Sequence, residues 1–166
     1  MSLQERLKLY LQHRTELINY AYALLNRREQ AEDVVQDVWL KFERQSLEAV
    51  RQPSGYLFRM VRNLAMDELR DQRLQQRYNA SLEHDPREHA DPASLASRRI
   101  ALERLQHALA ELDEDCRLAF EMHRFAGLTL QQIAANLGLS PSTAHRHVQQ
   151  AMRHCLNAVY GSDEHA

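Results

Sequence analysis

Apolar residues recur every three or four positions along most of the chain, a spacing typical of amphipathic helices rather than strands. The pattern predicts helices over residues 3–26, 28–45, 55–78, 96–112 and 114–126. A final pair of helices is expected over 130–137 and 141–159. The hydrophobic pattern therefore predicts an all-α fold.

The pattern lapses at two places between the predicted helices. Residues 46–54 form a loop punctuated by Pro53. Residues 79–95 lack periodicity, contain two Asp-Pro pairs, and hold four acidic residues against one basic residue. We interpret 79–95 as a flexible acidic linker that divides the chain into two small helical domains, 1–78 and 96–160.

Two apolar stripes define the faces that we expect to be buried in the first and fourth predicted helices. The first stripe consists of Leu7, Tyr10, Leu11, Ile18, Tyr22 and Leu25. The second consists of Leu95, Ile100, Leu102, Leu105, Leu109 and Leu112. In the fifth helix we expect Asp113 to be the N-cap and His123 to lie in the core.

The last two predicted helices are separated by a tight turn. Gly138 suits the left-handed position after a helix end, and Ser140 followed by Pro141 suits a helix start. Thr129 and Gln132 have the spacing of a capping box at the start of the first helix of the pair. This arrangement predicts a helix-turn-helix, although an ordinary helical hairpin has the same outline.

The outer face of the last helix favours DNA binding over a merely solvated surface. Arg and Gln side chains can make bidentate hydrogen bonds to base edges, and Ser and Thr hydroxyls suit bases or phosphates. The face contains no acidic residue. Its members are Ser142, Thr143, Arg146, Gln149, Gln150 and Arg153.

The second predicted helix has a polar face of a different kind. Asp33, Gln36 and Asp37 lie opposite its apolar stripe. The helix dipole accounts for an acid near the helix start such as Asp33, but it does not require Gln36 or Asp37. A protein-binding surface is the alternative.

The third predicted helix carries a line of arginines almost opposite its buried arc. An ordinary solvated face mixes positive and negative charges, so the line favours contacts with phosphates. Asn63 lies at the edge of the buried stripe. The arginines are Arg59, Arg62, Arg70, Arg73 and Arg77.

Composition narrows the functional classes. The net charge of −2 is low for a protein that binds DNA unaided, which indicates that a partner helps to hold the DNA. Two cysteines, no apolar run of membrane-spanning length and no signal-peptide core at the start favour a reduced, cytoplasmic protein without membrane insertion.

Catalytic and metal sites are not expected. The chain has neither a Gly-rich phosphate loop nor a zinc-protease helix motif, so we expect no enzyme activity and no cofactor. His145 and His147 lie about 200° apart around a helix and cannot share one metal ion locally.

Three segments in order resemble the extracytoplasmic-function sigma factors, the two-domain promoter-recognition subunits of bacterial RNA polymerase. Residues 31–42, AEDVVQDVWLKF, resemble their polymerase-binding helix. Residues 55–70, GYLFRMVRNLAMDELR, resemble the helix that recognises and opens the −10 promoter element. Residues 112–156 resemble the −35-binding domain. LYLQH near the start, CRLAFEMHR and the His154-Cys155 pair resemble the iron-starvation subgroup, which serves ferric-citrate and siderophore uptake.

The resemblance implies a role for each polar surface. Asp33, Gln36 and Asp37 would contact the clamp helices of the largest polymerase subunit. Arg59, Arg62, Asn63, Arg70 and Arg73 would contact the −10 DNA. A flipped base would enter a pocket formed by loop 45–54 and Asn63, with Tyr56 and Phe58 as stacking surfaces. Ser142, Thr143, His145, Arg146, Gln149 and Arg153 would contact the −35 element.

The resemblance also implies binding partners, and one alternative function stays open beside it. It implies core RNA polymerase, promoter DNA and an inner-membrane anti-sigma regulator that responds to an outer-membrane receptor. Many relatives carry a larger apolar residue and a Lys or Arg at the positions of Ala144 and His145, so the −35 sequence stays open. A self-sufficient dimeric helix-turn-helix repressor is the alternative, and it would require a stronger basic excess.

Overall fold

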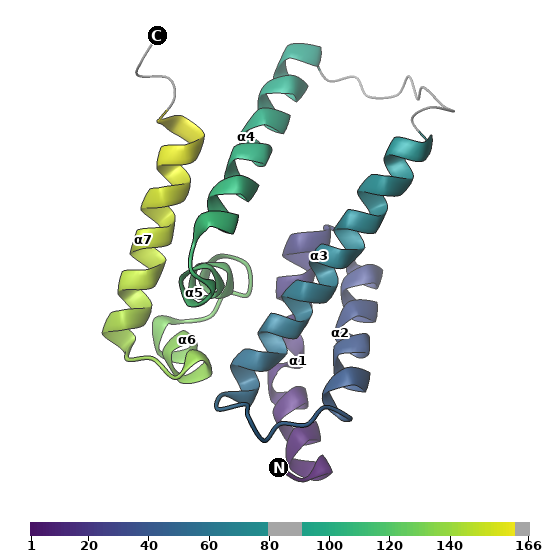
Figure 1. The fold of residues 1–166 in the computed structure, drawn as a ribbon, viewed down its shortest axis with the longest axis vertical. Helices are drawn as coiled ribbons and strands as arrows, with labels where there is room; N and C mark the ends of the chain where they lie inside the picture. Colours follow the sequence, from purple (N-terminus) through teal and green to yellow (C-terminus); the bar gives the residue numbers. More distant parts are fainter. Residues whose placement is uncertain (80–90, 162–166) are drawn as a thin grey trace.

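The computed structural model describes residues 1–79 and 91–161, and within these ranges it contains only α-helices and their connections (Figure 1). The all-α prediction is confirmed. The helices are α1 (Leu3–Leu25), α2 (Arg28–Phe42), α3 (Pro53–Asn79), α4 (Pro92–Glu111), α5 (Glu114–Arg124), α6 (Leu130–Leu137) and α7 (Pro141–Tyr160). Among the described residues, none of these helices combines the length and apolar character needed to cross a bilayer.

Local capping determines the boundaries of α6 and α7 as predicted. The Thr129 hydroxyl accepts a hydrogen bond from the Gln132 backbone N–H, and the Gln132 side chain accepts one from the Thr129 N–H. Gly138 ends α6 at φ 67°, a conformation that costs glycine little. Ser140 then accepts a hydrogen bond from the Thr143 N–H at 3.1 Å, which starts α7. The helix-turn-helix is therefore specified by its own sequence.

Helices α1, α2 and α3 pack against one another around an apolar core. The stripe predicted for α1 was only half correct, because Leu7, Leu11 and Tyr22 are exposed. The helix is apolar on more than one face, so periodicity alone could not select the buried one. The structure instead buries Tyr10, Leu17, Ile18, Tyr20, Ala21 and Leu25.

Helices α4, α5 and α7 surround a second, smaller core. It consists of Ala108, Cys116, Phe120, Ala151 and Cys155. Ile100 and Leu102 were expected to be buried in α4, but they are exposed. α4 packs mainly on α7, and one partner helix covers only a narrow stripe of another helix.

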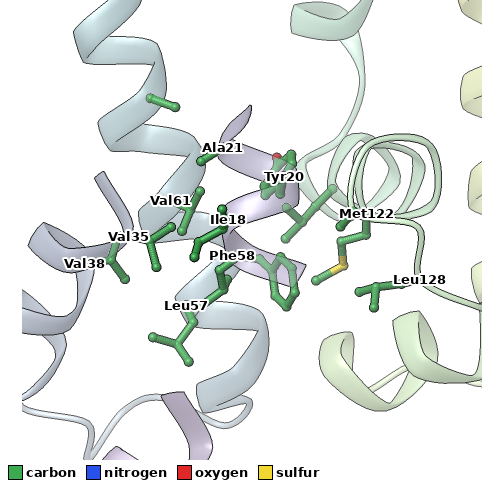
Figure 2. Close-up of a cluster of buried hydrophobic side chains, with 14 of the residues drawn as sticks. Ile18, Tyr20, Ala21, Val35, Val38, Leu57, Phe58, Val61, Met122 and Leu128 are labelled. Atoms are coloured by element: carbon green, nitrogen blue, oxygen red, sulfur yellow. The ribbon is translucent and has the colours of Figure 1, made fainter. Parts of the chain in front are cut away.

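The larger core continues from α1–α3 into α5 and α6. Met122 and Leu128 belong to the same buried cluster as Phe58 and Tyr20 (Figure 2). Gly55 in α3 lies so close to α6 that an added Cβ would stand 2.4 Å from the Asn136 carbonyl oxygen. We expected two helical units joined by a linker. The contact between these two units was not predicted.

The predicted linker is shorter in the structure. Asp91 caps α4 by accepting a hydrogen bond from the Ala93 N–H at 3.3 Å, and Pro92 is the first residue of the helix. Residues 92–95, expected to lack periodic structure, are therefore helical. Residues 80–90 lie outside the described residues.

Candidate nucleic-acid interface

The outer face of α7 is open to solvent along its predicted DNA-binding positions. Ser142, His145, Arg146, Gln149 and Arg153 are exposed, and Thr143 is half-buried beside the Ser140 cap. The opposite face is fixed by Ala144, Val148, Ala151 and Cys155, all buried. α7 contains neither Asp nor Glu, so its outer face presents donors without a competing carboxylate on the same helix. This arrangement suits a helix inserted in a DNA major groove.

The polar face of α2 is likewise exposed. Asp33, Gln36 and Asp37 all lie on the surface, while Val34, Val35 and Val38 are buried behind them. Leu40 is 46% exposed and, seven positions after Asp33, lies on the same side of the helix. The sequence prediction missed Leu40. The spacing of seven residues between Asp33 and Leu40 could have indicated that an apolar side chain lies beside the acidic group.

A hollow of about 550 Å³ lies between the end of α2 and the first half of α3. Tyr56 and Asn63 line it, as the predicted base pocket requires. Its complete lining is Leu40, Lys41, Arg44, Gln45, Tyr56, Met60, Asn63, Leu64 and Asp67. The hollow combines an aromatic ring, apolar side chains and amide groups, a mixture that could hold a nucleobase.

Two parts of the predicted base pocket lie elsewhere. Phe58 was expected to be a stacking surface, but it is fully buried with its ring against Tyr20 and His13. Residues 49–52 of the loop line a different hollow of about 530 Å³, together with Leu137 and Gly138. Phe58 follows the apolar arc of α3, and half of the loop faces the helix-turn-helix.

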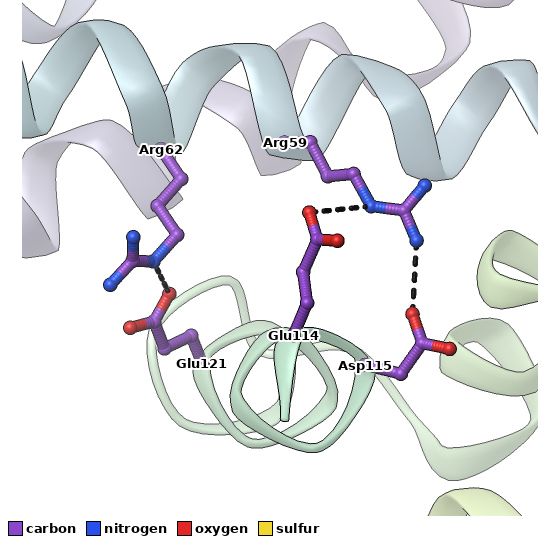
Figure 3. Close-up of polar contacts among 5 residues, drawn as sticks. All are labelled: Arg59, Arg62, Glu114, Asp115 and Glu121. Atoms are coloured by element: carbon purple, nitrogen blue, oxygen red, sulfur yellow. Dashed lines mark hydrogen bonds and ion pairs between the residues drawn. The ribbon is translucent and has the colours of Figure 1, made fainter. Parts of the chain in front are cut away.

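The arginine line of α3 is divided in two by the second half of the chain. Arg59 pairs with Glu114 at 3.2 Å and with Asp115 at 2.9 Å, and Arg62 pairs with Glu121 at 2.9 Å (Figure 3). All three acids belong to α5. Arg70, Arg73 and Arg77 are exposed farther along the helix, with Arg70 3.6 Å from Asp67. Only the far part of the predicted phosphate-binding face is open in this structure.

Glu121 occupies the centre of this contact. Its side chain is fully buried, and it accepts hydrogen bonds from the Tyr20 hydroxyl and the Arg62 guanidinium. Burial, together with the adjacent Glu121 carboxylate, raises the pKa of Tyr20 well above its ordinary value, so the hydroxyl stays protonated and donates. A buried carboxylate is tolerated only when it is paired in this way.

The sequence prediction missed the role of the three α5 acids. Periodicity placed them on a helix, but it did not show what packs against them. It also placed His123 in the core, whereas His123 is exposed, with Nδ1 3.0 Å from the Leu128 carbonyl oxygen. Asp113 precedes α5 as expected, but its side chain makes no capping hydrogen bond.

The histidines and cysteines of the described residues are the candidate metal ligands and reactive groups. Within 1–79 and 91–161, no group of three or more His, Cys, Asp or Glu side chains is placed to hold a metal ion. Cys116 and Cys155 are free thiols buried in the second core. Burial raises the pKa of both thiols, which lowers their reactivity.

Comparison with known proteins defines the class to which this site belongs. Residues 9–75 match the family model for Sigma-70 region 2, and residues 102–155 match the model for Sigma-70, region 4. The first match contains α2 and most of α3, and the second contains the helix-turn-helix. The two matches together cover most of the chain, which therefore belongs to the sigma-70 family.

Two sigma factors of similar sequence identify the chain as an alternative sigma factor of the extracytoplasmic-function type, which directs transcription from specific promoters. The ferric citrate uptake sigma factor FecI of Escherichia coli is 29% identical over 150 residues, which cover 89% of this chain and 87% of FecI. The ECF RNA polymerase sigma factor SigL of Mycobacterium tuberculosis is 29% identical over 150 residues, which cover 87% of this chain and 83% of SigL. A solved structure of the sigma factor RpoE with the anti-sigma factor NepR from Bartonella quintana matches with 21% identity and a TM-score of 0.42. That match covers 93% of this chain and 94% of the matched chain in that structure. Sigma factors are transcription-initiation factors.

Proposed function

We propose that this sigma factor divides promoter recognition between α3 and α7 and docks on core RNA polymerase through α2. The open, acid-free face of α7 carries the proposal, because a helix-turn-helix presents that face to the major groove. In this proposal Ser142, Thr143, His145, Arg146, Gln149 and Arg153 contact the −35 element. Residues 1–78 and 96–160 act as the two functional units.

The −10 element would be bound along α3. Arg59, Arg62, Arg70 and Arg73 would neutralise phosphates, and Asn63 with Tyr56 would hold an extruded base in the 550 Å³ hollow. Opening DNA costs on the order of 1.4 kcal/mol of stacking per base-pair step, and capture of an extruded base recovers part of that cost. Polymerase would supply the phosphate contacts that a chain of net charge −2 lacks.

The polymerase-binding surface would be the exposed face of α2. Asp33, Gln36 and Asp37 would contact the clamp helices of the largest subunit, with Leu40 adding apolar contact at one edge. Reversal of charge in Asp33→Lys should weaken assembly with core polymerase, measured by native gel or fluorescence anisotropy. Glu103→Lys makes the same change of charge on exposed α4 and should leave assembly unchanged. Equal affinity in both variants would refute the α2 assignment.

We further propose that the promoters served belong to iron-uptake genes. The similarity to the ferric citrate uptake sigma factor supports this assignment. Control would come from an inner-membrane anti-sigma regulator, and the factor would act in the cytoplasm, where polymerase and promoter DNA are found.

Run-off transcription with core polymerase on iron-uptake promoters tests the function directly. We expect specific transcripts only when factor and core polymerase are both present. A mobility-shift assay with the factor alone should show weak binding to duplex promoter DNA. Tight specific binding without polymerase would instead identify a self-sufficient repressor.

A further inference from the structure

The side chain of Arg6, near the start of α1, reaches the end of α2 and the connection that follows it (Figure 1). Its Nη1 donates hydrogen bonds to three backbone carbonyl oxygens, at 2.9 Å to Phe42, 3.0 Å to Glu43 and 2.8 Å to Gln45. We infer that Arg6 is a positioning residue for the 550 Å³ hollow, because it fixes the segment that forms one wall of that hollow. The inference rests on the proposed role of the hollow in holding an extruded base.

The last turn of α2 has backbone carbonyls that no residue of the same helix can satisfy. Many helices meet this need with a left-handed glycine at their end, as α6 does with Gly138. Glu43, which follows α2, is instead right-handed at φ −61°. The Arg6 guanidinium donates to the Phe42 and Glu43 carbonyls, and its positive charge also suits the negative end of the helix dipole. A side chain from another helix therefore completes the end of α2.

A local cap and a packed neighbour place Arg6 beside α2. Ser2 and Glu5 form a capping box that starts α1, and the Arg6 N–H donates to the Ser2 carbonyl at 3.0 Å. Tyr10, one turn after Arg6 on the same face, packs its ring against Trp39 with the centroids 5.1 Å apart. Since Tyr10 already holds this face of α1 against α2, loss of the Arg6 side chain should release the end of α2 without separating the two helices.

The segment that Arg6 holds supplies one side of the hollow. Gln45 belongs to both features, because it lines the hollow and its carbonyl accepts the 2.8 Å hydrogen bond from Arg6. Arg6 lies outside the described lining, so it would act through the segment and not on the base. If the end of α2 frayed, this wall would move while α3 kept Tyr56 and Asn63 in place. The lining residues from the end of α2 and its connection are Leu40, Lys41, Arg44 and Gln45.

Two substitutions at Arg6 and one control separate the hydrogen bonds from the charge. Arg6→Met keeps a long side chain but removes all three hydrogen bonds. Arg6→Lys keeps the charge, but its side chain is one bond shorter and lacks the guanidinium, so it reaches fewer of the carbonyls. Lys8→Met is the matched control, because it removes the same charge from an exposed site two positions later in α1.

The experiment uses each chain assembled with core polymerase and measures binding to the non-template strand of the −10 region by fluorescence anisotropy. The strand is that of the promoter with the strongest run-off transcript, prepared intact and as a series with one abasic nucleotide in each copy. We expect wild type and Lys8→Met to bind the intact strand on the order of tenfold more tightly than the weakest-binding abasic copy. This ratio should fall below about threefold for Arg6→Met, with Arg6→Lys between the two.

Two further measurements on the same chains distinguish a local effect on the wall from a general loss of structure. Amide hydrogen exchange at residues 43–47 should be faster in Arg6→Met than in Lys8→Met, while exchange within α3 stays unchanged. The affinity for core polymerase should also stay unchanged, because Asp33 and Asp37 lie earlier in α2 than the segment that Arg6 holds.

The base-to-abasic ratio decides the inference. If both Arg6 variants keep the wild-type ratio, or if Lys8→Met lowers it as much as they do, Arg6 is not a positioning residue. The inference is equally wrong if the affinity for core polymerase falls together with the ratio, because Arg6 would then support α2 as a whole. If Arg6→Met does not fold, Arg6→Lys decides: an intermediate ratio with faster exchange at 43–47 supports the inference, and a wild-type ratio overturns it.

Failure of the proposed function has a different signature. If wild type itself binds every abasic copy as tightly as the intact strand, the hollow holds no base, and both the proposed pocket and this inference are wrong. If wild type prefers the intact strand and the Arg6 variants share that preference in full, the proposed pocket stands and only the role of Arg6 is refuted.

Discussion

The two surfaces that we propose contact DNA differ in what lies opposite them. The outer face of α7 is open, whereas the first part of the α3 arginine line is covered by Glu114, Asp115 and Glu121 of α5. Both surfaces follow from the same pattern of polar residues opposite an apolar stripe. A helix pattern thus identifies a polar face, but the packing of distant segments decides whether that face is available.

The largest expected effect comes from a mutation in the apolar core beneath the covered surface of α3. Phe58 is fully buried, and its ring centroid lies 6.1 Å from that of Tyr20 and 5.9 Å from that of His13. Phe58→Ala should lower the free energy of unfolding by about 3–5 kcal/mol. Urea denaturation followed by circular dichroism measures this. Leu156→Ala, at a site 48% exposed on α7, should change it little, and similar losses in both variants would contradict the shared core.

A mutation on the open outer face of α7 should weaken DNA binding rather than lower the stability of the fold. Arg146→Ala removes an exposed guanidinium from α7 and should cost the polymerase complex about 1–3 kcal/mol of discrimination at the −35 element. Binding to a set of −35 sequence variants measures the loss, and Asn157→Ala at the far end of α7 is the control. An equal loss on every sequence would make Arg146 a phosphate contact instead of a base contact.

Two nearby serines should separate a side chain that stabilises α7 from a side chain that contacts DNA. The hydroxyl of Ser140 caps α7, so Ser140→Ala should lower the free energy of unfolding by about 1 kcal/mol. Ser142 is exposed two positions later, and Ser142→Ala should leave stability unchanged while weakening −35 binding. Thermal denaturation and promoter binding of the pair test this. A destabilised Ser142→Ala variant would be inconsistent with an exposed, DNA-facing side chain.

The smallest effect concerns the buried hydroxyl at the covered surface. Because the pKa of Tyr20 is raised in the folded chain, its contribution to stability is complete below the unfolded value of about 10 and declines at higher pH. Tyr20→Phe should therefore show a shallower loss of unfolding free energy above about pH 10 than wild type. Denaturation at a series of alkaline pH values measures the slope. Tyr160→Phe, an exposed site, should match wild type.

The sequence predicted the helices and the helix-turn-helix well because both depend on neighbours in the chain. The Thr129–Gln132 capping box, the left-handed Gly138 and the Ser140 cap all involve contacts within four residues. The exposed outer face of α7 was also predicted, since the small and apolar residues of this helix occupy one stripe on the opposite side. The exposed positions of Asp33, Gln36 and Asp37 followed for the same reason.

The errors arose where two or more faces of a helix had similar apolar content. Leu7 and Leu11 were expected in the core, and Leu17 and Tyr20 were not, although the structure reverses these assignments. Tyr20 is buried because α5 packs over it, and α5 begins more than ninety residues later in the chain. Periodicity carries no information about such a partner.

By itself, the sequence determined which parts of the chain form helices, where the capped helices α6 and α7 begin, and which polar faces could meet DNA or polymerase. Only the tertiary structure decided that Arg59 and Arg62 face carboxylates while Arg146 faces solvent. The physical reason is the separation along the chain of the residues on which each feature depends. Caps and helical stripes depend on residues a few positions apart, whereas the pairing of Arg62 with Glu121 joins positions 59 residues apart through the packing of two separate helical units.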